Sequence, residues 1–198
     1  KSFGEYDFAK GFHALNAFVT TELSGLYLDI CKDRLYCDSK NDHHRSGSQT
    51  TMALIARSLL GLVAPVITHT VDEILEYAPS CIKGEAKDVF DLVYEPLPEV
   101  ESSFDFVYFY EVRERFNECV DRFKKDKLIK SALELDIYTT SEKLLSMPRI
   151  EAEDLFLVSH ITTKERGDAL ASFDVDGDRF CVNKSQMHKC PRCWKFKS

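Results

Sequence analysis

The sequence has no run of about 18 consecutive apolar residues, so we expect no helix that crosses a membrane. Its first ten residues include Glu5 and Asp7 and contain no apolar stretch like that of a secretory signal. Only 8 glycines and 6 prolines occur, which excludes a collagen-like chain and a Pro/Gly-rich linker. The 7 cysteines are an odd number and stand mostly singly in apolar patterns. We therefore expect no disulfide framework and a reducing, cytoplasmic compartment.

Signatures of catalysis are also missing. There is no Gly-rich phosphate loop, no Gly-x-Ser-x-Gly and no His-Glu-x-x-His. No His or Cys is followed by Glu two residues later, which excludes a zinc deaminase. The acidic stretch over residues 174–178 lacks the Gly and Glu positions of a calcium loop and is more typical of a hairpin turn. The sequence therefore predicts no active site within this chain.

Positive charge is gathered in two places in a chain whose formal net charge is −7. A net acidic protein is not an obvious nucleic-acid binder, so these places matter more than the total. Residues 181–198 contain no acid and five cations, Lys184, Lys189, Arg192, Lys195 and Lys197. A short basic tail is by itself typical of a solvated chain end. The second place, Lys124, Lys125, Lys127 and Lys130, follows a predicted helix, where cations suit the helix dipole as well as they would suit a phosphate.

The apolar spacing of the first region predicts helices and no sheet. Apolar residues such as Phe8, Phe12 and Leu15 recur at intervals of three or four. Gly25 falls inside this pattern, which indicates a kink or a close contact between helices. The expected helices run over residues 5–36, from a cap at Ser46 or Ser48 to Val63 before Pro65, and from a Thr70–Glu73 capping box to Tyr77.

The second region changes to mixed patterns after an acidic, Pro-containing connector at residues 80–103. A long amphipathic helix is expected first, followed by residues in which apolar and polar side chains alternate. The expected elements are a helix over 104–129, strands over 133–138 and 155–161, a short helix over 141–147, and a hairpin over 173–182 that turns at Asp176-Gly177. The fold class is therefore mainly α, with a helical bundle followed by a small α/β domain.

Cys190-Pro-Arg-Cys193 is the sharpest local motif. Two thiolates separated by two residues can grip one tetrahedral metal, but structural zinc takes four ligands, so this is half a site. A redox pair and a bystander pair remain as alternatives. The redox interpretation requires the pair to stand at the N-terminus of a helix, which would lower the pKa of the thiol. No helix-forming run follows Cys193.

Several stretches in the same order resemble bacterial-type isoleucyl-tRNA synthetases. The most specific are Tyr27-Leu-Asp followed by Lys32-Asp-Arg-Leu-Tyr-Cys37, and Cys190-Pro-Arg-Cys-Trp194. The resemblance extends over residues 19–37, 49–50 with 62–74, 112–116 with 127–135, 153–159 and 189–194.

The resemblance implies three parts. These are a helical anticodon-binding domain with its connector over residues 1–95, a small α/β junction domain over 96–185, and a truncated zinc knuckle over 186–198. It implies that the parent charges tRNA with isoleucine as a monomer in the cytoplasm. The family's His-Ile-Gly-His and Lys-Met-Ser-Lys-Ser signatures and its editing domain are absent, so ATP and Mg²⁺ would bind outside this chain. The expected partners are the anticodon stem-loop of tRNA and the remainder of the synthetase chain.

The resemblance also directs attention to particular residues. The expected tRNA-binding residues are Lys32, Arg34, Arg45, Arg192 and Trp194, and the expected metal ligands are Cys190 and Cys193, with the family's second cysteine pair beyond residue 198. The chain has Arg-Ser-Gly-Ser-Gln-Thr at residues 45–50 where the family often has Arg-Arg-Ser-Ala-Gln-Thr, so the resemblance does not carry a second arginine contact over to this chain. The alternative is a stand-alone helical scaffold for protein partners with a zinc or redox tail.

Overall fold

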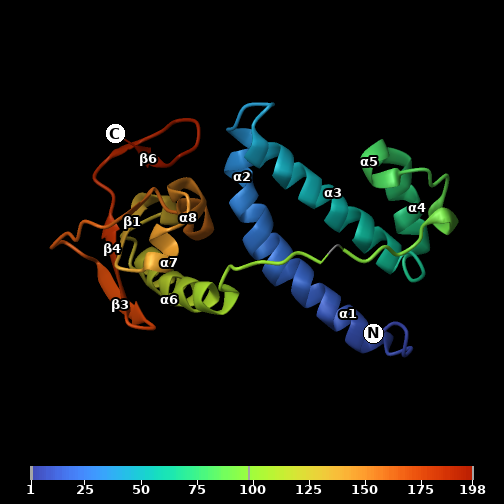
Figure 1. The fold of residues 1–198 in the computed structure, drawn as a ribbon, viewed down its shortest axis with the longest axis horizontal. Coiled ribbons are helices and arrows are strands. Elements are labelled where there is room, and N and C mark those ends of the chain that lie inside the picture. Colours follow the sequence, from blue (N-terminus) through green and yellow to red (C-terminus); the bar gives the residue numbers. More distant parts are fainter. Residues whose placement is uncertain (1, 98, 198) are drawn as a thin grey trace. The chain divides into compact units, whose positions relative to one another are not determined.

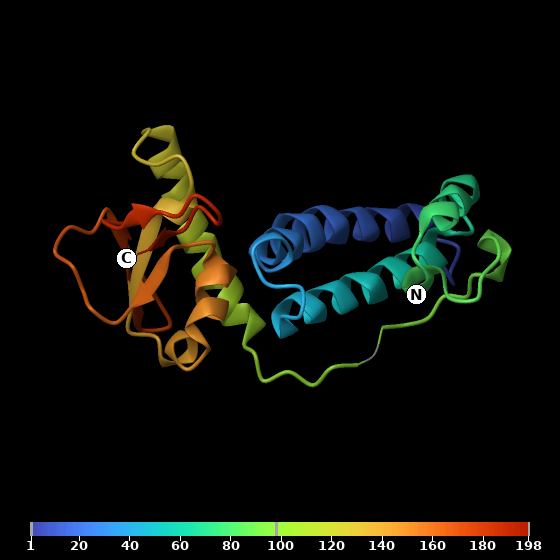
Figure 2. The same cartoon turned by 90° about the horizontal axis from the view of Figure 1, so that it is seen from above.

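The computed structural model describes residues 2–97 and 99–197 and divides into two compact units, Lys1–Ser102 and Ser103–Ser198. The first unit is helical, and the second combines helices with a small sheet (Figures 1 and 2). This confirms the mainly α fold class. The narrower boundaries expected after residues 95 and 185 stay predictions. Among the described residues, no helix is both long enough and apolar enough to span a membrane.

One helical rod opens the first unit. It consists of α1 (Phe8–Ala17), a π-helical segment η1 (Phe18–Leu28) and α2 (Asp29–Tyr36). Asp7 caps the rod by accepting a hydrogen bond from the Lys10 amide at 3.1 Å. Gly25 lies in the π segment, where an added Cβ would meet the Thr20 carbonyl oxygen at 3.1 Å. The crowding at Gly25 therefore comes from its own widened helix and not from a neighbouring one.

The next helix, α3 (His43–Val63), begins earlier than expected. Its cap is Asp42, whose carboxylate accepts hydrogen bonds from the His44 amide at 2.8 Å and the Arg45 amide at 3.3 Å. The expectation of a cap at Ser46 or Ser48 was therefore wrong, because an Asx cap four residues upstream already satisfies the first amides. The helix ends at Val63, before Pro65, as expected.

The rest of the first unit closes a small core against α3. It contains α4 (Thr68–Tyr77), α5 (Ser80–Lys83) and the short 3-10 turn η2 (Val89–Asp91). No side chain caps α4, and the helix starts at Thr68, so the expected Thr70–Glu73 capping box is wrong. The buried cluster is made of Leu60, Ala64, Val71, Leu75 and Val89.

A strap of chain after η2 crosses α3. Ser58 Oγ donates to the Glu95 carbonyl oxygen at 3.0 Å, and the Arg57 guanidinium pairs with the Glu95 carboxylate at 2.7 Å. An added Cβ on Gly61 would meet the Tyr94 Cα at 3.0 Å and the Val93 carbonyl oxygen at 3.1 Å. A glycine is therefore what lets the strap lie directly on the helix.

The second unit is organised around α6 (Phe106–Lys125) and a four-stranded sheet. The helix buries one apolar stripe, made of Tyr108, Phe109, Val112, Phe116, Val120 and Phe123. The sheet contains β1 (Leu135–Thr139), β2 (His160–Thr162), β3 (Ala171–Val175) and β4 (Asp178–Lys184), in the order β2-β1-β4-β3. The pair β1–β2 is parallel and the other two pairs are antiparallel.

The parallel pair follows from a helical crossover of α7 (Glu142–Leu145) and α8 (Arg149–Phe156) between β1 and β2. The expected strand over residues 155–161 was therefore mostly wrong. The apolar run from Leu155 ends a helix, Leu157 adopts the left-handed conformation at its C-terminus, and only the last residues enter a strand. Phe156 packs edge-on against Phe109 and Phe116, with ring centroids 5.6 and 5.8 Å away, so the crossover completes the core.

The expected hairpin is confirmed. Asp176 and Gly177 both have positive φ, 50° and 87°, which is typical of the tight turn that joins twisted antiparallel strands. A second, two-stranded ribbon of β5 (His188–Lys189) and β6 (Phe196–Lys197) follows β4 and encloses the cysteine pair.

Two glycines of α3 give a matched prediction for stability. Gly47→Ala adds a methyl group to open space, so we expect the free energy of unfolding to rise by about 0.5–1 kcal/mol through helix propensity. Gly61→Ala has the same propensity gain but forces its methyl group against the strap backbone, which costs about 1–3 kcal/mol. Thermal unfolding followed by circular dichroism measures both changes. An equal stabilisation by the two substitutions would contradict the tight crossing of the strap.

Candidate nucleic-acid interface and cysteine knuckle

Lys32 and Arg34 lie on α2 and Arg45 lies on α3, and the turn that joins these two helices is at one end of the helical unit (Figure 1). Tyr27 and Cys31 help to fix this end. The Tyr27 hydroxyl donates to the Ser48 carbonyl oxygen at 3.5 Å, and Cys31 is fully buried. Burial raises the pKa of the Tyr27 phenol, so it remains a neutral donor.

The three cations differ in their surroundings. The Lys32 ammonium is 2.5 Å from the Asp29 carboxylate, and this hydrogen bond raises the pKa of Lys32, so the side chain stays charged. Lys32 and Arg34 are two positions apart on α2 and therefore do not share a face. Arg45 lies in the first turn of α3, whereas a cap at Ser46 or Ser48 would have left it outside the helix, and its guanidinium donates to the Asp38 carbonyl oxygen at 3.4 Å. Arg34 in the last turn of α2 and Arg45 in the first turn of α3 thus flank the connecting turn, and Lys32 lies further back on α2, paired with Asp29.

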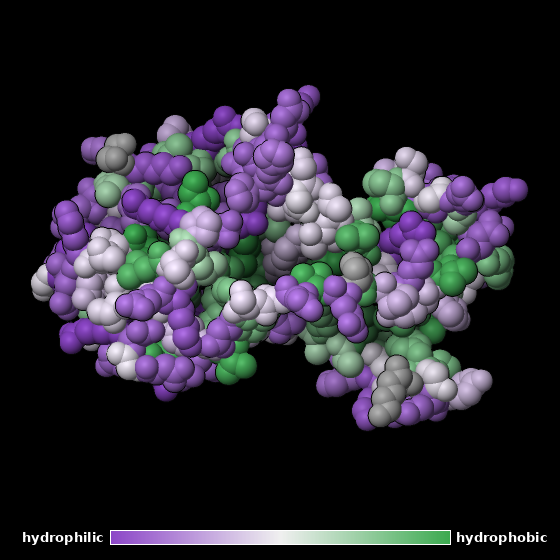
Figure 3. Space-filling model, viewed as in Figure 1, coloured by the Kyte–Doolittle hydropathy of each residue, from purple (hydrophilic) through white to green (hydrophobic). Residues whose placement is uncertain are grey.

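A different feature of the same unit is an apolar groove of about 660 Å³ between α3, α4 and α5. Figure 3 shows hydrophobic residues exposed over these helices. Among the described residues that line this groove, Glu73 alone is charged. A groove with apolar walls and an acid offers nothing to a phosphate backbone, so it does not belong to a nucleic-acid surface.

In the second unit, Cys190 and Cys193 lie in the turn that joins β5 to β6. The turn is closed by the Trp194 amide, which donates to the Cys190 carbonyl oxygen at 3.0 Å, and by the Cys190 amide, which donates to the Lys195 carbonyl oxygen at 2.8 Å. Hydrogen bonds from the backbone amides of Cys193 and Arg192 lower the pKa of the Cys190 thiol. The knuckle therefore favours a thiolate at Cys190.

A thiolate in a tight knuckle fits the chemistry of a zinc ligand. Within residues 2–97 and 99–197, however, no three His, Cys, Asp or Glu side chains are grouped so that they could hold a metal ion. The described residues thus offer two ligands of a possible tetrahedral set.

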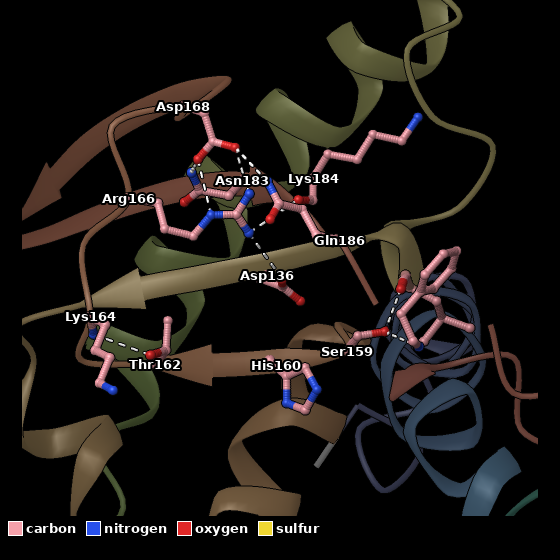
Figure 4. Close-up of polar contacts among 12 residues, drawn as sticks. Asp136, Ser159, His160, Thr162, Lys164, Arg166, Asp168, Asn183, Lys184 and Gln186 are labelled. Atoms are coloured by element: carbon pink, nitrogen blue, oxygen red, sulfur yellow. Dashed lines mark hydrogen bonds and ion pairs between the residues drawn. The ribbon is translucent and has the colours of Figure 1, made fainter. Parts of the chain in front are cut away.

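A buried ion pair, which no sequence pattern predicted, fixes the knuckle to the body of the unit. The Lys195 ammonium is 2.6 Å from the Asp154 carboxylate of α8, and their side chains are only 8% and 5% exposed. The Phe196 amide donates to Ser159 Oγ at 2.6 Å, and this hydroxyl donates to the Leu133 carbonyl oxygen at 2.5 Å (Figure 4). A Lys in a basic tail gives no local signal of burial, because its partner lies 41 residues away.

Arg192 and Trp194 point to solvent from this anchored turn. Trp194 is 62% exposed, and the Lys189 ammonium lies 5.3 Å from its ring centroid. Arg192 is exposed as well. Lys195 and Phe196 make the contacts that hold the knuckle to the unit, whereas most of the Trp194 side chain is exposed.

A second polar cluster on the sheet was also missed. Arg166 bridges Asp168, at 2.5 Å, and the buried Asp136, at 3.6 Å, and Asn183 donates to Asp168 at 3.1 Å (Figure 4). Burial raises the pKa of the Asp136 carboxyl. The cluster ties the loop before β3 to the polar face of the sheet, which explains it as a structural network.

Comparison with known proteins gives a consistent result. A family model described as the anticodon-binding domain of tRNA ligase matches residues 1–139. An isoleucine–tRNA ligase of a Nitratiruptor species is 56% identical over 198 residues, which is 100% of this chain and 22% of the relative. Those of Campylobacter concisus and a Sulfurovum species are 51% and 50% identical over 98% and 100% of this chain. The chain spans about a fifth of the length of these relatives, 21% and 22% in the last two.

The buried ion pair yields a prediction. Lys195→Met leaves the Asp154 carboxylate buried without its partner. We therefore expect this variant to destabilise the closed knuckle, so that the free energy needed to open it falls by about 3–5 kcal/mol. Lys195→Met combined with Asp154→Leu removes both charges and should recover most of this loss. Trp194 is the only tryptophan, so its fluorescence during urea titration reports on the knuckle.

Lys197→Met, at an exposed neighbouring position, is the control and should change the same free energy by less than about 0.5 kcal/mol. If Lys195→Met behaves like this control, the ion pair does not hold the knuckle.

Proposed function

Because the chain belongs to the family of anticodon-binding domains of tRNA ligases, we propose that it recognises the anticodon stem-loop of tRNA as part of an isoleucine–tRNA ligase. The observation that carries this proposal is the family match over residues 1–139, together with identities of 50–56% to three isoleucine–tRNA ligases. The parent reaction would be the ATP-dependent attachment of isoleucine to tRNA. The chain contributes RNA binding and no catalytic residue, and ATP and Mg²⁺ would be bound elsewhere in the ligase.

The helical unit supports this role through the turn between α2 and α3. Arg34 and Arg45 flank the turn, and the Arg guanidinium suits phosphate oxygens because it donates several hydrogen bonds from one plane. Lys32 adds a positive charge nearby on α2, where its ammonium group is paired with Asp29. Such contacts position the RNA, whereas reading of the loop bases requires stacking and hydrogen bonds to their edges.

The knuckle supports a second contact. Trp194 presents an exposed ring, and an unstacked base of the anticodon loop can stack on such a ring for about 1–3 kcal/mol. Arg192, exposed in the same turn, would hold an adjacent phosphate. Cys190 and Cys193 would supply two thiolates to one structural zinc, with the remaining pair beyond residue 198. When bound, zinc would lock the turn that carries both side chains.

The rival proposal is a stand-alone helical scaffold for protein partners with a zinc or redox tail. A gel-shift assay with tRNA separates the two, because only the anticodon-binding role requires binding of the RNA by this chain.

Removal of the cations around the α2–α3 turn tests the contact of the helical unit. Replacing Lys32, Arg34 and Arg45 by Gln should weaken binding of isoleucine tRNA. It should also lower the slope of log affinity against log salt by about 0.7–0.9 for each phosphate that the protein no longer neutralises. Fluorescence anisotropy of labelled tRNA at several salt concentrations measures both quantities.

A matched control removes the same charge from the same unit by replacing Lys10, Lys83 and Lys87 with Gln. These positions lie outside the turn, so the salt slope should stay close to that of the unsubstituted chain. If both triple variants lose affinity equally, the effect is one of net charge and the assignment of the turn is wrong.

The metal content of the knuckle gives a separate prediction. Two thiolates bind zinc far more weakly than four, so metal analysis should find well below one equivalent in this chain. A longer chain that continues through a second cysteine pair should hold about one equivalent and lose it on Cys190→Ser. In that longer chain, Trp194→Ala should weaken tRNA binding about 5- to 100-fold while leaving the zinc content unchanged. Absence of zinc from the longer chain would contradict the proposed zinc site. Full tRNA affinity of the Trp194→Ala variant would contradict the proposed stacking on Trp194.

A further inference from the structure

The turn that ends α6 carries four exposed lysines, Lys124, Lys125, Lys127 and Lys130, here called the basic turn. Its backbone is well defined. Lys127 adopts the left-handed conformation with φ of 57°, the Leu128 amide donates to the Phe123 carbonyl oxygen at 2.9 Å, and Ile129 is buried at 4% exposure. The end of α6 projects from the body of its unit (Figure 2). The four ammonium groups are therefore presented on a rigid support.

Within the described ranges 2–97 and 99–197, none of these ammonium groups takes part in an ion pair with an acid within 4 Å. Asp126 is the only acid between residues 122 and 130. The nearby Glu134 is engaged otherwise, because it accepts the Lys130 backbone amide at 2.9 Å and pairs with Lys184 at 3.8 Å. The basic turn is thus a local excess of unpaired positive charge on a chain of net charge −7.

The helix dipole does not account for all four lysines. Cations are favoured within the last turn of a helix, where Lys124 and Lys125 lie. Lys127 and Lys130 lie beyond the helix end, and the effect of the dipole falls off there. The Leu128 carbonyl oxygen already receives a hydrogen bond from Lys184 at 2.9 Å. The dipole therefore accounts for Lys124 and Lys125 and leaves Lys127 and Lys130 as additional exposed charges beside them.

We propose that the basic turn binds phosphates of the tRNA backbone and so gives the second unit its own RNA contact, separate from the α2–α3 turn and the knuckle. This inference rests on the proposed function. RNA is favoured over other anionic partners because the family match over residues 1–139 does not stop with the helical unit but includes the whole basic turn. Lysines act as point charges toward phosphate and read no base edges, so the contact is independent of RNA sequence.

The test replaces Lys124, Lys125, Lys127 and Lys130 with Gln in this chain and measures the anisotropy of labelled isoleucine tRNA from 50 to 300 mM salt. Removal of four phosphate contacts should lower the salt slope by about 3 and the affinity at 100 mM salt about tenfold or more. A tRNA of different sequence should show the same loss, because the contact reads no bases. Circular dichroism should stay unchanged, since none of the four side chains is buried or paired.

The control variant removes four charges elsewhere, by Lys10→Gln, Lys83→Gln, Lys87→Gln and Lys164→Gln, and should leave the slope nearly unchanged. If the unsubstituted chain binds tRNA and the basic-turn variant retains its affinity and slope, the inference is wrong while the proposed function stands. An equal loss in both variants also overturns it, because net charge would then explain the result. If the unsubstituted chain binds no tRNA, the proposed function fails and the inference fails with it.

Discussion

The ion pair between Lys195 and Asp154 is the contact on which the arrangement of the basic C-terminal segment depends. It buries a cation from a stretch that otherwise faces water, and it does so against a carboxylate of α8 in the core of the second unit. With Lys195 held, the Cys190–Lys195 hydrogen bond closes the knuckle and the neighbouring Trp194 is left outside. The position of the thiols and the exposure of the indole ring therefore share one electrostatic cause.

Positive charge serves two purposes in this acidic chain. Lys195 and Arg166 are turned inward and join distant elements, as buried or half-buried charges do when each has a close partner. Lys124, Lys127 and the other lysines of the basic turn face water without acidic partners among the residues described. Net charge alone conceals this division, and a negative total is compatible with local surfaces that attract a polyanion.

The sequence predicted elements whose signals are local and unambiguous. The apolar stripe of α6, the stop before Pro65 and the Asp176-Gly177 turn all appear as expected, because periodicity, proline and positive φ act within a few residues. Asp42 was missed because several Ser and Asp residues compete as caps in one polar stretch. The run at Leu155 was misassigned because a short apolar segment fits a buried strand as well as the end of a buried helix. In the candidate site, the acid-free tail and the cysteine spacing could likewise be read from the sequence. The anchoring of the tail by Asp154 and Ser159 could not, because it depends on how α8 and β2 pack against residues far along the chain.

The backbone at Trp194 has a consequence for how this position can vary. Its φ of 62° is left-handed, a conformation that costs a bulky L-residue about 1–2 kcal/mol and a glycine nothing. A glycine at this position would avoid that cost, so the fold displays the exposed indole ring at an energetic expense. Position 194 is thus one where a drift toward glycine would relax the fold while erasing the surface that the knuckle displays.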